Sequence, residues 1–147
     1  MYGGKIVSAQ DIFHVTVKRA LEKEKWVITA DPLKLKFGGI NFQVDLAAER
    51  LLEAERNGEK IAVEIKSFLN ASAITDFYAA LGQFLSYRLA LSTIEPNRSL
   101  YLAIPIDAFD TFFQMEFTQI AIKHYQVPLI IYDPVKEVIT QWIKINS

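Results

Sequence analysis

The chain has no cysteine among its 147 residues. This absence excludes disulfide bonds, thiolate metal sites and cysteine nucleophiles, and it fits a reducing compartment. No apolar run approaches the ~18 residues of a membrane span, and the first residues, Met1 to Lys5, lack the hydrophobic stretch of a signal peptide. We therefore expect a cytoplasmic protein with no membrane-spanning segment.

An excess of charge of one sign is also lacking, since 16 Lys and Arg against 17 Asp and Glu give a net charge of −1. Strong binding to nucleic acid draws most of its affinity from neutralised phosphates, so this balance disfavours strong unaided binding. Any basic surface must be local. Three pairs could supply it, Lys34 with Lys36, Lys18 with Lys25, and Arg50 with Arg56; the alternative is that these are ordinary solvated charges.

No internal repeat, linker or low-complexity segment divides the chain, and 51% hydrophobic residues suffice for a packed core. We predict one domain over residues 1–147, with residues 1–7 as a flexible or short extended N-terminus. The acids Glu49, Glu53 and Glu55 fit a solvated face, and the four phenylalanines between 109 and 117 fit a core or a patch for a partner or a second subunit.

Periodicity predicts three helices, over 11–25 with Ser8 as N-cap, from Ser72 to about Ser92, and from Asp107 as cap to about His124. Three strands are expected after the first helix, over 26–30, 33–37 or on through 46, and 61–68. One strand over 99–104 follows the second helix, and a hairpin over 127–132 and 138–143 closes the chain. The order α-β-β-β-α-β-α-β-β predicts an α/β fold with a central mixed sheet flanked by helices.

An acid and an amine, Glu64 and Lys66, stand two residues apart on the otherwise apolar strand 61–66. Because strand side chains alternate, the aliphatic residues at 61, 63 and 65 face a core, and Glu64 and Lys66 share the opposite face. A second acid, Asp45, ends a similar alternation, in which we expect the buried face to comprise Phe42, Val44 and Leu46. The two strands thus predict two carboxylates and an amine on one polar face.

The pairing of these two strands sets a geometric condition. Asn57-Gly58 favours a two-residue hairpin pairing Arg56 with Glu59, so that paired residue numbers sum to 115. Bringing Asp45 opposite Glu64 requires a sum of 109. The difference of six must be absorbed by a bulge or by a short helical excursion through 48–54, and we expect the excursion.

Two carboxylates on one polar face suit a hard divalent ion, and Mg²⁺ prefers one or two carboxylates with water and substrate phosphate; Mn²⁺ may substitute. Asp45 and Glu64 are the expected metal ligands, and Lys66 the residue that holds the attacking water or stabilises the phosphorane. The chemistry indicated is phosphodiester hydrolysis. The alternative is a structural salt-bridge cluster on a solvent-facing sheet.

The pattern of Asp45 followed by Glu64-Ile65-Lys66 between two helices resembles the PD-(D/E)xK restriction-endonuclease-like superfamily. Gln83 and Tyr87, one helical turn apart, are similar to the Gln-x-x-x-Tyr motif of some branches, which implies that they orient substrate. The resemblance also implies an acid on the first helix, where Asp11 and His14 share a face and either one could reach the site. Glu49 is a further accessory candidate.

A closer resemblance, to the XisH family, covers nearly everything from Ser8 onward. It rests on the segments 26–33, 44–49, 61–68, 80–83 and 100–105. Members are fdxN element excision controlling factors, found mainly in cyanobacteria. The resemblance implies a part in DNA-element excision during heterocyst differentiation, a DNA partner, a companion protein called XisI and, as in many such nucleases, a homodimer. It leaves two functions open: a Mg²⁺-dependent deoxyribonuclease, or a non-catalytic regulator acting through XisI or a recombinase.

Overall fold

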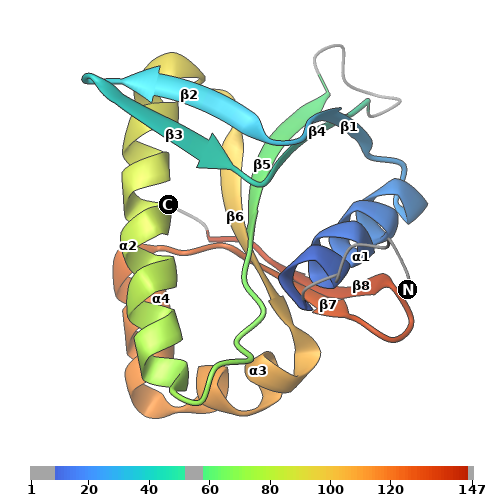
Figure 1. Ribbon diagram of the computed structural model, residues 1–147, viewed down its shortest axis with the longest axis vertical. Coiled ribbons are helices and arrows are strands. Elements are labelled where there is room, and N and C mark those ends of the chain that lie inside the picture. Colours follow the sequence, from blue (N-terminus) through green and yellow to red (C-terminus); the bar gives the residue numbers. More distant parts are fainter. Residues whose placement is uncertain (1–8, 52–57, 146–147) are drawn as a thin grey trace, which may run out of the picture.

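The computed structural model describes residues 9–51 and 58–145 (Figure 1). The predicted N-cap Ser8, the N-terminal segment 1–7 and the hairpin residue Asn57 lie outside the described residues. The helices are α1 (Ala9–Lys23), α2 (Ala73–Ile94), α3 (Ile106–Asp110), the 3₁₀ turn η1 (Phe112–Gln114) and α4 (Glu116–Tyr125). The strands are β1 (Val27–Ala30), β2 (Leu33–Phe37), β3 (Ile40–Val44), β4 (Leu46–Arg50), β5 (Glu59–Ile65), β6 (Ser99–Pro105), β7 (Leu129–Asp133) and β8 (Val138–Ile143).

Six of these strands form one mixed sheet in the order β1-β4-β5-β6-β7-β8. β4 is antiparallel to β1 and β5, β6 is parallel to β5 and β7, and β8 returns antiparallel to β7. Parallel neighbours need a crossover, which α2 supplies between β5 and β6, and α3 to α4 between β6 and β7. The predicted α/β class, a mixed central sheet flanked by helices, is confirmed.

Each face of the sheet carries its own apolar core. On one face α1 packs Val17 and Leu21 against strand residues such as Val63. On the other, α2 and the α3–α4 segment bring in large side chains such as Phe84 and Phe113. Figure 1 shows α1 on one side of the sheet and α2 with α4 on the other. The central strand β5 is therefore covered on both faces.

β2 and β3 form a separate two-stranded ribbon, residues 33–44, which crosses over the C-terminal half of α2 in Figure 1. Its inner face packs on the α2 core, where Leu35 and Val44 are buried. The ring of Phe42 meets the ring of Tyr87 edge-on, with centroids 6.1 Å apart. The ribbon is thus anchored to the body of the domain by alternate residues.

The described residues between α1 and α2, 24–51 and 58–72, hold five strands, whereas three were predicted. Gly38 and Gly39, both at positive φ, turn the chain between β2 and β3, and a bend at Asp45 separates β3 from β4. The alternation restarts at this bend, so Val44 packs in the α2 core but Leu46 packs in the α1 core. The prediction that Leu46 shares a buried face with Val44 was therefore wrong.

The third predicted helix is broken into α3, η1 and α4. Asp107 lies in the first turn of α3, and Pro105 occupies the cap position assigned to Asp107. At Thr111 the backbone leaves the helix with φ −115° and ψ −88°, and the rings of Phe112 and Phe113 then pack 5.6 and 5.8 Å from the ring of Phe77. The free energy gained by burying these rings exceeds what a continuous helix would contribute here.

The other elements agree more closely with the sequence. The side chain of Ser72 caps α2 by accepting a 3.3 Å hydrogen bond from the Thr75 amide, as an N-cap serine does. The closing hairpin forms, and both the Val135 and the Lys136 amides donate to Asp133 Oδ1 in its turn. No helix in the part of the chain that the structure describes is long and apolar enough to cross a membrane.

Candidate functional site

The pairing of β4 with β5 brings the two predicted acids together. Leu46 lies opposite Val63 and Arg50 opposite Glu59, so paired numbers sum to 109 and Asp45 reaches the level of Glu64. The register favoured by Asn57-Gly58 is not used. The expected helical excursion was wrong over Ala48–Arg50, which continue β4 because Ala48 is fully buried opposite Ile61. Residues 52–57 lie outside the described part of the chain.

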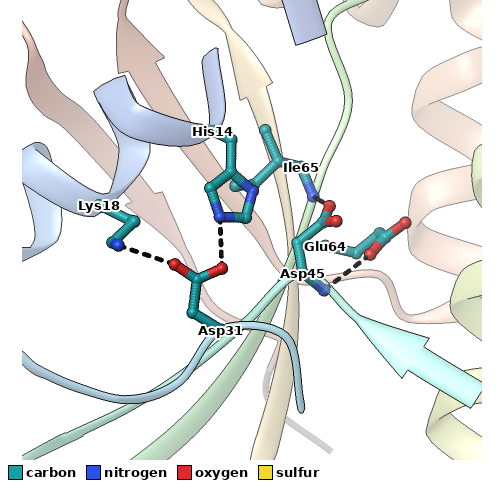
Figure 2. A network of polar contacts seen from close by, with 6 residues as sticks. All are labelled: His14, Lys18, Asp31, Asp45, Glu64 and Ile65. Atoms are coloured by element: carbon teal, nitrogen blue, oxygen red, sulfur yellow. Dashed lines mark hydrogen bonds and ion pairs between the residues drawn. The ribbon is translucent and has the colours of Figure 1, made fainter. Parts of the chain in front are cut away.

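Asp45 and Glu64 are held by reciprocal hydrogen bonds between side chain and backbone. The amide of Asp45 donates to Oε1 of Glu64 over 3.2 Å, and the amide of Ile65 donates to Oδ2 of Asp45 over 2.8 Å (Figure 2). Each carboxylate is thus fixed by the strand that carries the other. Each bond uses one carboxylate oxygen, and the other oxygen of Glu64, Oε2, lies 3.4 Å from the amine of Lys66.

Glu64 is buried inside the fold, not on a solvent-facing surface. Its neighbour Ala62 belongs to the α2 core and Ile61, Val63 and Ile65 to the α1 core, which confirms the predicted alternation. Glu64 is only 4% exposed. Burial and the nearby charge of Asp45 raise the pKa of Glu64 to about 8, although Lys66 acts in the opposite direction. A carboxyl group in this environment gains from a cation close by.

Lys66 follows the end of β5 and supplies such a cation. Its Nζ lies 3.4 Å from Oε2 of Glu64, and 24% of its side chain is exposed. Its backbone is tied on both sides, because its amide donates to the Ala103 carbonyl over 2.9 Å and its carbonyl accepts from the Tyr132 hydroxyl over 3.3 Å. The amine therefore sits between the buried acid and solvent on a fixed stretch of main chain.

Of the two residues predicted on the second helix, only Tyr87 lies close enough to the acids for their charges to act on it. Burial, then the charges of Glu64 and Asp45, raise the pKa of Tyr87 to about 12, so its hydroxyl is neutral near the acid pair. Gln83, one turn earlier on α2, is exposed. The structure places Gln83 on the same helix as Tyr87 but at the surface.

The first helix contributes His14 to a different network. His14 Nε2 and Lys18 Nζ each lie 2.7 Å from an oxygen of Asp31, in the turn after β1 (Figure 2). Burial opposes ionisation of Asp31, but its hydrogen bonds to Lys18 and His14 hold its pKa below the ordinary value. Sequence reasoning did not single out Asp31 for the site, because its partners are distant in the sequence. The side chain of Asp11 lies outside the described residues.

Glu49 is not brought to the acid pair. It lies four residues beyond Asp45 along an extended chain, a distance of about 13 Å at the usual rise per residue. Its Oε1 lies 3.8 Å from Lys60 Nζ and 3.6 Å from Arg98 Nη2. The structure therefore gives Glu49 a place in a separate charged cluster.

A cavity of about 210 Å³ opens beside Lys66, and its lining includes Ser67, Asn70 and Asp76. The side-chain amide of Asn70 donates to Oδ1 of Asp76 over 2.9 Å. Sequence reasoning missed Asp76, since an acid in the first turn of a helix is readily explained by the helix dipole. The sequence signal that could have identified Asp76 is its position in the first turn of the helix that follows the Glu64–Lys66 strand.

The acid pair fits Mg²⁺, which takes one or two carboxylates and completes its shell with water and phosphate oxygens. Asp45 and Glu64 are the residues that would hold it. Among the residues that the structure describes, no group of three or more His, Asp and Glu side chains could hold a metal ion by itself.

Comparison with known proteins identifies the chain's relatives. A family model described as XisH protein matches residues 7–140. An XisH family protein from Nostoc punctiforme PCC 73102 has a solved structure with 52% identity and a TM-score of 0.84, and the match covers 91% of this chain and 100% of that one. An fdxN element excision controlling factor protein from Anabaena variabilis matches with 50% identity and a TM-score of 0.83 over 91% of this chain and 99% of that one.

A comparison with curated proteins finds no match. The family model nevertheless spans most of the chain, and each of the two solved structures shares at least half of the aligned residues. On these grounds the chain belongs to the XisH family.

Proposed function

We propose that this protein is an excision controlling factor with a PD-(D/E)xK nuclease-like site, acting on DNA by Mg²⁺-dependent phosphodiester hydrolysis in the cytoplasm. The observation that carries the proposal is the acid pair, in which Asp45 and the buried Glu64 are clamped together beside Lys66. The solved relative named as an excision controlling factor supports the biological role.

In the proposed reaction a water oxygen bonds to phosphorus and gives up a proton to solvent, while the P–O bond to the leaving nucleotide breaks and the leaving oxygen takes a proton from solvent. Mg²⁺, when bound, supplies Lewis-acid chemistry that lowers the pKa of water and offsets charge on the phosphate. Asp45 and Glu64 would hold the ion. Lys66 orients the attacking water and offsets charge on the phosphorane, and Tyr87, with Gln83, orients the substrate.

The test is cleavage of single-stranded, duplex and branched DNA with Mg²⁺ or Mn²⁺, comparing wild type with Lys66→Ala. Loss of an electrostatic stabiliser of this kind costs about 10²–10³-fold in rate. Lys60→Ala is the matched control, because Lys60 lies on β5, the strand that leads to Lys66, but its side chain is half exposed and pairs with Glu49. Cleavage that survives Lys66→Ala at the rate of the control would reject this mechanism.

A non-catalytic regulator is the second candidate, and the raised pKa of Glu64 favours it. A carboxyl group that holds its proton near pH 7 and bonds the Asp45 amide can serve the fold alone. Such a protein would act through a companion of the XisI type, as the family resemblance implies. Calorimetric titration separates the two: tight association with the companion and no binding of Mg²⁺ or Mn²⁺ would favour regulation.

A further inference from the structure

The β2–β3 ribbon turns one polar face away from the domain. Its members are exposed and directly paired across the two strands, Lys34 with Gln43 and Lys36 with Asn41. We call these four residues the outer ribbon face. They line a groove of about 340 Å³ together with Leu35 and Phe42.

The charged residues of this ribbon are all positive. Residues 33–44 contain two lysines and no Asp or Glu, a net charge of +2. Because the whole chain carries −1, the rest of the chain carries −3. A local cationic face on an otherwise acidic domain suits a polyanion, and it satisfies the condition that any basic surface must be local.

The ribbon is also held rigidly next to the acid pair. Asp45 follows directly on β3, so Gln43 is two residues from a proposed metal ligand. The inner face is pinned by buried Leu35 and Val44 and by the contact of Phe42 with Tyr87, which itself lies near Asp45 and Glu64. A ligand on the outer ribbon face would therefore extend toward the site from a fixed direction.

We infer that the outer ribbon face binds duplex DNA and holds it beside the acid pair; this rests on the proposed function. The lysines contact phosphates: Lys34 and Lys36 are about 6.8 Å apart along the strand, which corresponds to an axial rise of about two base pairs at about 3.4 Å each. The amides of Asn41 and Gln43 reach base edges, because a two-stranded ribbon enters the major groove and such amides pair with adenine.

The composition of the face selects duplex DNA among nucleic acids. Single strands are bound by aromatic side chains on which the bases stack, but Phe37 and Phe42 pack against the α2 core, and the outer ribbon face consists of two lysines and two side-chain amides. Double-stranded RNA has a deep, narrow major groove that side chains cannot read. The wide major groove of B-DNA is the surface that fits.

The test measures binding of wild type and two double variants to a fluorescent DNA duplex by anisotropy, in EDTA and at several salt concentrations. Lys34→Ala/Lys36→Ala should weaken binding roughly tenfold and lower the slope of log K against log salt by about 1.8, or about 0.9 for each phosphate contact. Lys123→Ala/Lys136→Ala is the control, since it removes the same charge from two exposed lysines on α4 and the β7–β8 turn. Thermal unfolding verifies that all three proteins fold.

Equal binding by the two double variants overturns the inference, as does tighter wild-type binding to single-stranded DNA or to RNA than to the duplex. Cleavage in Mg²⁺ is measured separately. Loss of duplex binding in the ribbon variant alone supports the inference even where wild type cleaves nothing, which would reject the nuclease mechanism only. If wild type cleaves DNA but Lys34→Ala/Lys36→Ala binds the duplex as tightly as wild type does, the proposed function stands and the inference about the ribbon is rejected.

Discussion

The amide of Asp45 donates to the carboxylate of Glu64 over 3.2 Å, and the carboxylate of Asp45 accepts from the residue after Glu64 over 2.8 Å. The two strands therefore hold two acids close together where one of them is almost fully buried. Their mutual repulsion is reduced when Glu64 binds a proton or when a cation lies between them. These two ways of relieving it lead to the first two predictions.

The thermal stability of the metal-free protein should fall as pH rises from about 5 to about 9. Burial and the charge of Asp45 raise the pKa of Glu64 from 4.5 to about 8, so the folded state keeps a proton that the unfolded state has released. The resulting stabilisation is complete below pH 4.5 and is lost as pH rises through about 8. Because 1 kcal/mol shifts Tm by about 2–4 °C in a domain of this size, we expect a change of several degrees.

The control for this effect is Glu64→Gln, which keeps an oxygen to accept from Asp45 but cannot ionise. Thermal unfolding in EDTA, followed by circular dichroism across this pH range, should give a flatter curve for the variant. A wild-type curve as flat as that of Glu64→Gln would contradict the prediction.

Affinity for Mg²⁺ should rise with pH and level off above about pH 8. Binding requires the ionised carboxylate, so below the raised pKa of Glu64 each bound ion displaces up to one proton, and affinity changes by up to about tenfold per pH unit. Calorimetry in two buffers with different ionisation enthalpies measures the released protons. Glu49→Gln should bind normally and Glu64→Gln should not; an affinity independent of pH would argue against Glu64 as a ligand.

Features set by local rules could be predicted from the sequence. Alternation along β5 placed Glu64 and Lys66 on one face, and the capping preference of serine located the start of α2 at Ser72. The register that places Asp45 opposite Glu64 could be stated only as a requirement for the site, because the local turn preference of Asn57-Gly58 favoured a different pairing. The two registers differ by six residues, an even number that leaves each side chain on its own face, so alternation alone could not choose between them. The structure pairs Ala48 with Ile61, and both residues are buried.

Features set by tertiary packing could not be predicted. The bend at Asp45 exists because the chain leaves the β2–β3 ribbon and enters the main sheet there, and no local signal marks that change. The break at Thr111 depends on aromatic partners as distant as Phe68, whose ring stands 5.1 Å from that of Phe113. The pairing of His14 with Asp31 likewise joins residues 17 positions apart.

Arg98 should be essential to the stability of the sheet. Its side chain is 8% exposed, and its Nε donates to Glu95 over 2.6 Å while Nη1 donates to the Ile61 carbonyl over 3.1 Å. Arg98→Ala removes the partner of the Ile61 carbonyl and of the Glu95 carboxylate, at a cost of about 2–3 kcal/mol in the free energy of unfolding. Arg98→Lys should recover little, since an ammonium group cannot copy the planar fork.

Arg19→Ala is the matched comparison in a denaturant titration. Arg19 pairs with Glu137 at 3.1 Å, but its side chain is 60% exposed. An exposed pair contributes less than about 1 kcal/mol. If Arg98→Ala and Arg19→Ala lower the free energy of unfolding by similar amounts, burial does not set the strength of the Arg98 contacts.

Gly82→Ala should stabilise the protein by about 0.5–1 kcal/mol, raising Tm by about 1–4 °C. Gly82 lies inside α2, where glycine costs backbone entropy, and a Cβ there would meet nothing within 4 Å. Gly38→Ala is the control, because it also meets nothing within 4 Å but has φ +59°, which strains alanine. A lower Tm for Gly82→Ala would contradict the prediction. Since Gly82 precedes Gln83, higher stability combined with weaker DNA binding would place the substrate against this turn of α2.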